Sequence, residues 1–273
     1  MRVVFQQCTK FSTSCNRAFL ARFLKPVMNA SPKEHVVKQL LKPIGLNVPP
    51  RPNIKYSEGN SWLDLFDGAK TEERIKELEI EFAKSGMYEM ATFRKTNGKL
   101  FLSPESYWKA DKALYFPHLS GRTLSSEDHG NVEDVLRGKT SVIRVFSTQV
   151  GDKISREYIK NTELGIDNYE NQSCQVIDIN FLENKLKSWL FKLSLNNLKS
   201  TVPVQRHDNY WLCHREQIPF LMRERLLINN VYSGYIFVVD PNLKIRFMAC
   251  GPASADEFNK LWKVVGQLSK EKK

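Results

Sequence analysis

The second half of the chain alternates between compact apolar runs and segments whose apolar residues are spaced as on one helix face. β-Branched and aromatic residues dominate the compact runs, and such composition favours strands. The four runs that we expect to be strands are 140–147, 174–179, 235–239 and 244–249. The turn residues Asp240-Pro241-Asn242 separate the last two, which predicts a hairpin. A further strand, turn and strand is expected over 115–124, with its turn at Ser120-Gly121.

Helical spacing follows the second strand and closes the chain. Asn180 with Glu183 three residues later is a capping-box arrangement, which predicts a helix start there. The expected buried stripe of that helix is Leu182, Leu186, Trp189, Leu190 and Leu193. Another helical region is expected at 220–227, and a last helix begins at Ser254. The apolar face of the last helix is Phe258, Leu261, Trp262, Val265 and Leu268.

The order of these elements is a βαβ unit, then an antiparallel hairpin, then a final helix. That order is typical of a thioredoxin-like α/β fold. Periodicity alone leaves other α/β arrangements open. A domain of this kind is predicted over 105–270, preceded by an arm at 34–104. In the arm, prolines across 42–60 indicate an extended segment, and a charged helix is expected from Thr71 to Ser85.

The positive charge of the chain is concentrated at its start. The net charge is +11, and residues 1–33 hold six basic residues and no acidic one, so that the rest carries +5. Arg17, Arg22 and Lys25 lie outside an apolar arc around Phe19–Leu24, in a segment that also contains serines. This pattern predicts a mitochondrial transit peptide over 1–33, the alternative being a basic surface arm or helix. No stretch approaches the roughly 20 apolar residues of a membrane span.

The five cysteines do not fit a redox enzyme. A thioredoxin or peroxiredoxin carries its reactive thiol just after the first central strand, at a helix N-terminus. That position is Phe146–Asp152 here, and it contains Ser147 and Thr148 but no cysteine. We expect Cys174 and Cys250 to be core residues. The local cluster of Cys213, His214 and His207 leaves a metal site open as a minor alternative, because such a site needs three or four ligands.

Two blocks of sequence are more specific than the alternation of apolar and polar residues. One joins Phe116–Leu124 to the run Gly138–Ser147, and the other joins Gly234–Asp240 to Lys244–Ala253 and Glu257–Trp262. Together they resemble the fungal mitochondrial ATP synthase assembly factor family, the chaperones of membrane-sector subunit a (subunit 6). The family-motif positions, structural or client-binding, are Phe116, Pro117, Gly121, Gly234, Tyr235, Asp240, Arg246 and Gly251.

The resemblance implies a peroxiredoxin-type thioredoxin-like domain that lacks the redox cysteines and is preceded by an extended and helical arm. It implies a non-enzymatic chaperone without a cofactor, metal, nucleic acid or small-molecule substrate. Its partner would be newly made subunit a, which it helps to join the c-ring. Its location would be the matrix side of the mitochondrial inner membrane, in peripheral contact with that membrane.

A chaperone of a very hydrophobic subunit should offer an apolar surface. The candidate client surface lies in the arm and includes Ile44, Trp62, Leu65 and Phe66, although these residues could instead pack back on the domain. Two other functions stay open. One is a thiol-redox or metal-handling protein on the same fold. The other is a matrix RNA-binding protein, suggested by basic and aromatic residues interleaved over 205–225.

Overall fold

The computed structural model describes residues 35–52, 87–161, 174–183 and 188–271, together with 54, 56, 78, 80, 81, 84, 166 and 167. The expected transit peptide lies outside the described residues. So do Trp62, Leu65 and Phe66 and most of the expected helix over 71–85.

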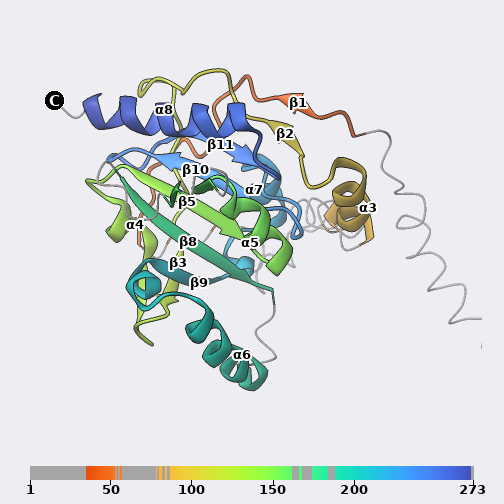
Figure 1. The fold of residues 1–273 in the computed structure, drawn as a ribbon, viewed down its shortest axis with the longest axis vertical. Helices are drawn as coiled ribbons and strands as arrows, with labels where there is room; N and C mark the ends of the chain where they lie inside the picture. Colours follow the sequence, from red (N-terminus) through yellow and green to blue (C-terminus); the bar gives the residue numbers. More distant parts are fainter. Residues whose placement is uncertain are drawn as a thin grey trace, which may run out of the picture.

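A seven-stranded sheet forms the centre of the molecule (Figure 1), in the order β11-β10-β5-β8-β9-β3-β4. The strands are β3 (Ser120–Thr123), β4 (His129–Asn131), β5 (Ser141–Phe146), β8 (Gln175–Leu182), β9 (Tyr210–His214), β10 (Tyr235–Val239) and β11 (Ile245–Cys250). Strands β5, β8 and β9 are parallel, and every other pair in this sheet is antiparallel. The order β11-β10-β5-β8, with β10 antiparallel to β5, is thioredoxin-like, so the predicted fold class is confirmed.

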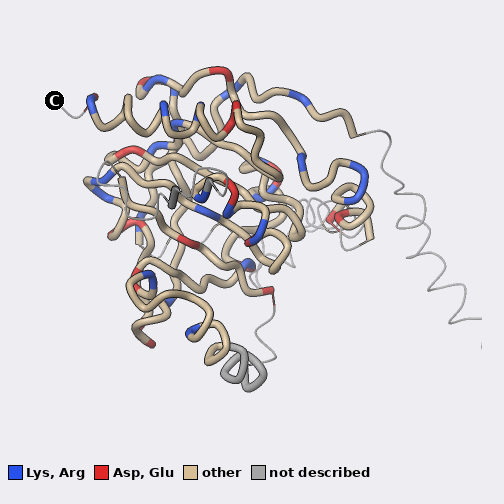
Figure 2. The backbone as a smooth tube through the Cα atoms, in the orientation of Figure 1, with Lys and Arg blue, Asp and Glu red and all other residues tan. Residues whose placement is uncertain are grey.

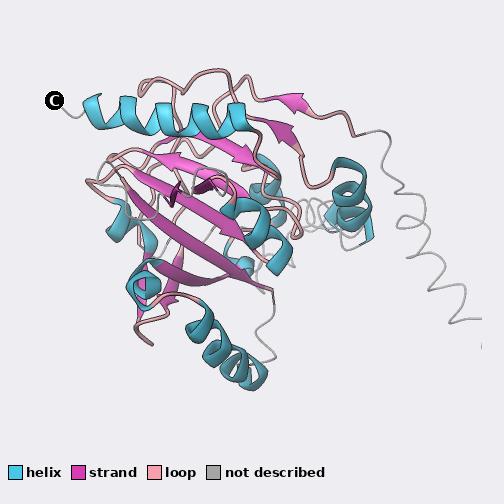
Figure 3. Ribbon diagram, viewed as in Figure 1, coloured by secondary structure: helices cyan, strands magenta, loops and turns pink. Residues whose placement is uncertain are grey.

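Helices and short strands surround this sheet (Figure 3). The helices are α3 (Met87–Thr96), α4 (Val132–Leu136), α5 (Gln149–Arg156), α6 (Ser188–Thr201), α7 (Phe220–Arg225) and α8 (Ala255–Glu271), with 3-10 turns η4 (Val204–Asn209) and η5 (Arg215–Gln217). The short strands are β1 (Lys38–Gln39), β2 (Phe101–Leu102), β6 (Lys160–Asn161) and β7 (Ile166–Asp167). None of the helices in the described part of the chain is long and apolar enough to cross a membrane.

Alternate residues of the central strands supply apolar cores on both faces of the sheet, two large ones and a small third cluster around Leu124, Phe146, Tyr210 and Leu212. In β5, Ile143 belongs to a large core with Phe116 and Phe237, whereas Val142 belongs to a second core. The second core lies under α8 (Figure 1) through Leu261, Val264, Val265 and Leu268. Leu261, Val265 and Leu268 belong to the predicted face and Trp262 packs at its border, whereas Val264 was not predicted and Phe258 is only half-buried outside this core. The two cores therefore hold both faces of β5 and fix where that strand ends.

The arm is packed along one edge of the domain. β1 pairs with β2, and the backbone of Leu46 exchanges hydrogen bonds with that of Tyr115 at 2.9 and 2.8 Å. Lys99 joins β2 to the C-terminal part of the chain, because its ammonium donates to the carbonyl oxygens of Cys250 at 3.0 Å and Pro252 at 2.6 Å and also contacts Glu257.

Three sequence expectations were wrong in detail. Ser120 and Gly121 lie inside β3, where Gly121 pairs with Gly130 and Cys213, so the turn comes later. Asn180 lies inside β8, which continues to Leu182 because it pairs with β9. The predicted capping box is therefore absent from this segment, and the described helix begins at Ser188. β9 itself was not predicted.

Candidate functional site at the carboxyl ends of the central strands

The junction of β5 and α5 is the position at which a redox thioredoxin carries its reactive thiol. Phe146 ends β5, Ser147 is half-buried, and Thr148 caps α5. The Thr148 hydroxyl accepts a hydrogen bond from the Gly151 amide at 3.2 Å and donates to the Val231 carbonyl at 3.2 Å. It is therefore committed to closing the helix N-terminus, as N-cap hydroxyls commonly are.

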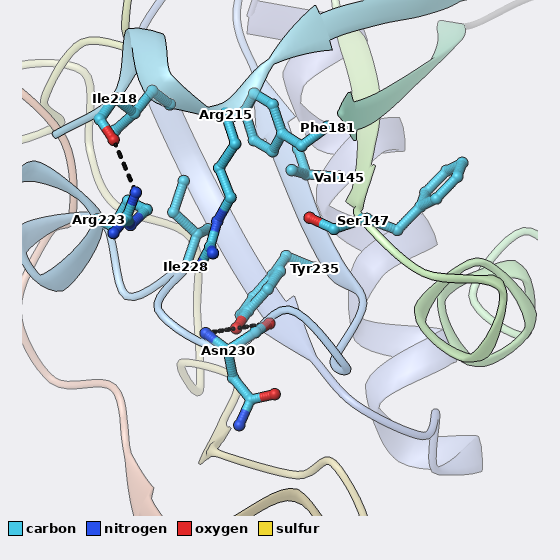
Figure 4. Close-up of a pocket in the computed structure, with 10 residues that line it drawn as sticks. Val145, Ser147, Phe181, Arg215, Ile218, Arg223, Ile228, Asn230 and Tyr235 are labelled. Carbon is cyan, nitrogen blue, oxygen red and sulfur yellow. Dashed lines mark hydrogen bonds between the residues drawn. The ribbon is translucent and has the colours of Figure 1, made fainter. Parts of the chain in front are cut away.

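A pocket opens beside this junction (Figure 4), with a volume of about 260 Å³ including the part open to solvent. Its lining residues come from β5, β8, β10 and the segment after β9: Val145, Phe146, Ser147, Phe181, Arg215, Ile218, Arg223, Ile228, Asn230 and Tyr235. Half of these side chains are apolar, and the polar groups come from Ser147, Asn230, the tyrosine and the two arginines. The pocket thus combines apolar walls with several hydrogen-bonding groups, as ligand sites do.

Arg215 projects into the pocket toward Ile228 (Figure 4). Its Nη1 donates to Glu183 at 3.1 Å. Its Nη2 is buried, lies 3.7 Å from Glu89 Oε1 and has no hydrogen-bond partner among the residues that the structure describes. An unpaired buried donor costs free energy, about 1–3 kcal/mol, so this N–H is chemically available to a carbonyl, a carboxylate or a water molecule.

Glu89 of α3 links the floor of the pocket to the arm. Its Oε2 accepts a hydrogen bond from the Val231 amide at 2.7 Å, and its carbonyl oxygen accepts one from the Asn230 side chain at 2.7 Å. Burial raises the pKa of Glu89, partly opposed by the Val231 amide and Arg215. The Glu89 carboxylate therefore accepts hydrogen bonds at a buried site, where desolvation disfavours its negative charge.

The second arginine of the pocket is also paired. Arg223 Nη2 donates to Glu81 at 2.8 Å, and its Nη1 donates to the Ile218 carbonyl at 3.3 Å. Burial lowers the pKa of Arg223, and Arg215 lowers it further. Since Glu81, Glu89 and Glu183 all contact these two arginines, the positive charge of the pocket is largely balanced within the protein. The geometry fits one polar ligand atom better than a multiply charged anion.

A buried ionic network lies under the start of α5. Arg144 of β5 is fully buried and donates to Asp178 of β8 at 2.8 Å, while it also contacts Asp152 of α5. Arg206 donates to the other oxygen of Asp178 at 3.1 Å and to the Val176 carbonyl at 2.8 Å. The network ties α5 and η4 to the central strands, so it holds the rim of the site in one position.

The three cysteines among the described residues lie away from the β5–α5 junction and are not disulfide-bonded. Cys213 and Cys250 are buried, as expected for Cys250, and Cys174 is half-buried just before β8. Burial raises the pKa of Cys174 and of Cys250 to about 12 and raises that of Cys213 further. Because the thiolate is the reactive form, these are poor nucleophiles.

The structure separates the residues that could have formed a metal site or an RNA-binding surface. Cys213 and His214 are neighbours in β9 and so point to opposite faces of the sheet, and His207 contacts the Val202 carbonyl at 3.0 Å. Within the described ranges, no group of three potential ligands could hold a metal ion. The interleaved run at 205–225 does not form one surface, because Arg206, Tyr210 and Trp211 are buried.

The family-motif residues in the hairpin of β10 and β11 have structural contacts. Asp240 accepts hydrogen bonds from the amides of Asn242 at 2.9 Å and Lys244 at 3.0 Å, and from Arg246 at 3.0 Å. Its carboxylate thus closes the hairpin turn. Tyr235 is buried, and its hydroxyl exchanges hydrogen bonds with the Asn230 backbone at 2.9 Å, below the pocket.

The motif glycines mark close approaches of the backbone. A Cβ atom on Gly234 would lie 2.3 Å from the Gly151 carbonyl oxygen, so only glycine lets β10 lie this close to α5. One on Gly121 would lie 2.5 Å from the Leu212 carbonyl oxygen of β9. Gly251 has a φ of +68° and packs on Gly98.

The two remaining motif residues, Phe116 and Pro117, are buried. The Phe116 ring packs edge-on against Phe237 with centroids 5.5 Å apart. Of the candidate client surface, Ile44 is half-buried and packs against the large core, next to Leu46. Among the family-motif and client-surface residues that the structure describes, Tyr235 alone lines the pocket. Of the other polar lining residues, Ser147 occupies the position expected for a redox thiol, and Arg215 in η5 and Arg223 in α7 belong to the basic and aromatic run at 205–225. No short motif marks Asn230.

The fold and this site define a thioredoxin-like protein whose redox position carries hydroxyls in place of thiols. Residues 25–268 match the family described as ATP10 protein, so the chain belongs to the ATP10 family. The mitochondrial ATPase complex subunit ATP10 of Saccharomyces cerevisiae is 48% identical over 269 residues, which cover 94% of this chain and 96% of that protein.

A second relative, with the same description, comes from Eremothecium gossypii and is 47% identical over 250 residues, covering 90% of this chain and 91% of that protein. Among solved structures, BsSco, a member of the Sco family of cytochrome c oxidase assembly proteins, overlays with a TM-score of 0.42 at 11% identity. The overlay covers 62% of this chain and all of BsSco. The fold assignment itself rests on the strand order given above.

Proposed function

We propose that the protein is a non-catalytic assembly factor of the mitochondrial ATPase complex, which binds newly made subunit a (subunit 6) on the matrix side of the inner membrane. Binding would hold that subunit until it joins the c-ring. Membership of the ATP10 family supports the role in the complex. The specific client and the membrane location follow from the family resemblance.

The observation that carries the non-catalytic part is the composition of the β5–α5 junction. Ser147 and Thr148 stand where thiol chemistry would need a cysteine, and a hydroxyl does not perform thiol–disulfide exchange. The thiols of Cys174, Cys213 and Cys250 are buried or half-buried with raised pKa values. The fold then acts as a scaffold that presents surfaces.

The test is crosslinking in isolated mitochondria while subunit a is being synthesised. A photoreactive residue replaces Trp62 or Phe66 of the candidate client surface, and the control places it at Lys153, which is exposed on α5. We expect newly made subunit a to be captured from 62 or 66 and not from 153. Absence of that subunit from every crosslinked product would refute the proposed client.

The packing of the arm decides how its role in capture is tested. Because Ile44 and Leu46 pack on the core, deletion of 42–66 would uncover that core as well as remove the surface. Substituting Trp62, Leu65 and Phe66 together by Ser is cleaner. We expect weaker capture of subunit a with an unchanged unfolding midpoint, whereas Val204→Ser, at a side chain that is 75% exposed, should leave capture intact.

A further inference from the structure

Three loops meet at the end of the molecule where β5 and β8 begin. The Lys244 ammonium donates to the Ala110 carbonyl at 2.7 Å, and the Gly138 amide donates to the Pro241 carbonyl at 3.0 Å. The loops 109–112, 137–139 and 241–244 therefore adjoin, although they are far apart in sequence. We call this end of the domain the basic face.

The basic face carries an excess of positive charge. Lys109, Lys112, Arg137 and Lys139 are exposed, and Lys244 is half-buried with its ammonium at the surface. Asp111 is the acidic residue of these three loops, so they hold five positive charges and one negative charge. Figure 2 shows basic and acidic residues interspersed along the tube near the C-terminus of α8. Nearby, Asp240 and Glu271 are both paired with Arg246, and Asp134 is exposed on α4, three residues before Arg137.

The chemistry of the face suits phosphate headgroups better than bases. Binding of single-stranded nucleic acid relies on exposed aromatic rings on which bases stack. Here Trp108 is buried, and Tyr115 is half-buried with the Lys244 ammonium 5.2 Å above its ring. Flexible lysines on a surface without stacking rings match a layer of anionic headgroups.

We propose that the basic face docks the protein on the anionic lipid headgroups of a membrane. The proposal rests on the peripheral membrane location suggested above and assigns a surface to it. Each basic residue at such a surface strengthens partitioning by about fivefold. The arm runs beside this face, because Leu46 pairs with Tyr115, which in turn bridges to Lys244. Docking would thus bring the start of the candidate client surface to the membrane.

The orientation of the pocket follows from β5. That strand starts at Ser141 near the basic face and ends at Phe146 beside the pocket. Six residues of strand span about 20 Å, so the pocket opens well away from the lipid surface. A molecule docked in this way keeps the pocket accessible from the aqueous side.

The test is binding of the protein, purified from mitochondria, to vesicles of phosphatidylcholine with or without phosphatidylglycerol. The test variant combines Lys109→Gln, Lys112→Gln and Lys139→Gln. A matched control combines Arg94→Gln, Lys153→Gln and Arg225→Gln, which removes the same charge from exposed positions on α3, α5 and α7. Thermal unfolding verifies that both variants fold.

We expect the wild-type protein and the control variant to bind only the vesicles that contain phosphatidylglycerol, and salt should release them. The test variant should bind these vesicles about a hundredfold more weakly. The proposal is overturned if the test variant binds like wild type, or if the control loses as much. It is also overturned if the face retains RNA more tightly than anionic vesicles. The vesicles contain no subunit a, so a negative result here leaves the crosslinking experiment unaffected.

Discussion

The substitution Ser147→Cys introduces a thiol at the β5–α5 junction. It tests whether the surroundings of this position still activate a thiol, as they do in redox thioredoxins. Ser147 directly precedes the N-cap of α5, and a thiol near a helix N-terminus has a lowered pKa because the helix dipole favours its anion. The native thiols of Cys174, Cys213 and Cys250 serve as internal controls in the same molecule.

The size of the expected difference follows from the thiolate fractions. With a pKa of about 12, Cys174 and Cys250 are ionised to about one part in ten thousand at pH 8. An ordinary exposed thiol, with a pKa near 8.5, is ionised to roughly one part in four at that pH. The introduced thiol should therefore hold at least about a thousandfold more thiolate than these native thiols and react about a hundredfold faster, because a less basic thiolate is a weaker nucleophile.

The assay is alkylation by iodoacetamide under native conditions, with each labelled peptide quantified by mass spectrometry. We expect labelling at position 147 first, and labelling at 174, 213 and 250 only after denaturation. Comparable native-state rates at all four positions would refute the argument from burial. An introduced thiol as slow as the native ones would show that the junction does not activate a nucleophile.

Other predictions concern the packing and charge around the site. Gly234→Ala places a methyl group 2.3 Å from a backbone oxygen of α5, so we expect a loss of about 3 kcal/mol in urea unfolding, whereas Gly266→Ala, in an open helical position, should be neutral or stabilising. Asp178→Asn leaves buried Arg144 without its best partner and should cost about 3 kcal/mol; a loss below about 1 kcal/mol would contradict the network. Burial raises the pKa of Glu89 in the folded protein. The contribution of Glu89 to folding stability is therefore complete below the ordinary pKa of a glutamate, and it is lost as the pH rises through the raised pKa of the folded state. Thermal midpoints of wild type should therefore fall relative to those of Glu89→Gln as pH rises above about 4.3, and parallel pH profiles would count against this reading.

The local pattern of apolar residues was enough to predict those elements whose apolar side chains pack directly into a core. β5, the hairpin of β10 and β11, and α8 were predicted from their apolar residues, because these segments line the two cores directly. Pattern failed where a strand depends on a partner. Asn180 has the side chain of a helix cap, yet it stays in β8 because β9 offers a further row of backbone hydrogen bonds.

The site was less predictable than the fold. The missing cysteine at Ser147 was visible, because its position follows from the order of strands. The pocket was not visible, because Arg215, Asn230 and Glu89 come from three separate segments and meet only in the folded protein. No spacing within the sequence reports such a meeting.

The clamp that Lys99 makes with the segment 250–257 has a consequence for the order of folding. A ribosome completes residue 99 about 150 residues before it completes Cys250, whose carbonyl oxygen Lys99 binds. Leu46 of the arm can pair with Tyr115 much earlier, because its two backbone hydrogen bonds need only the first half of the chain. A chain that stops before β11 would therefore lack both carbonyl acceptors of Lys99, so completion of the last hairpin is the event that adds this clamp to the arm.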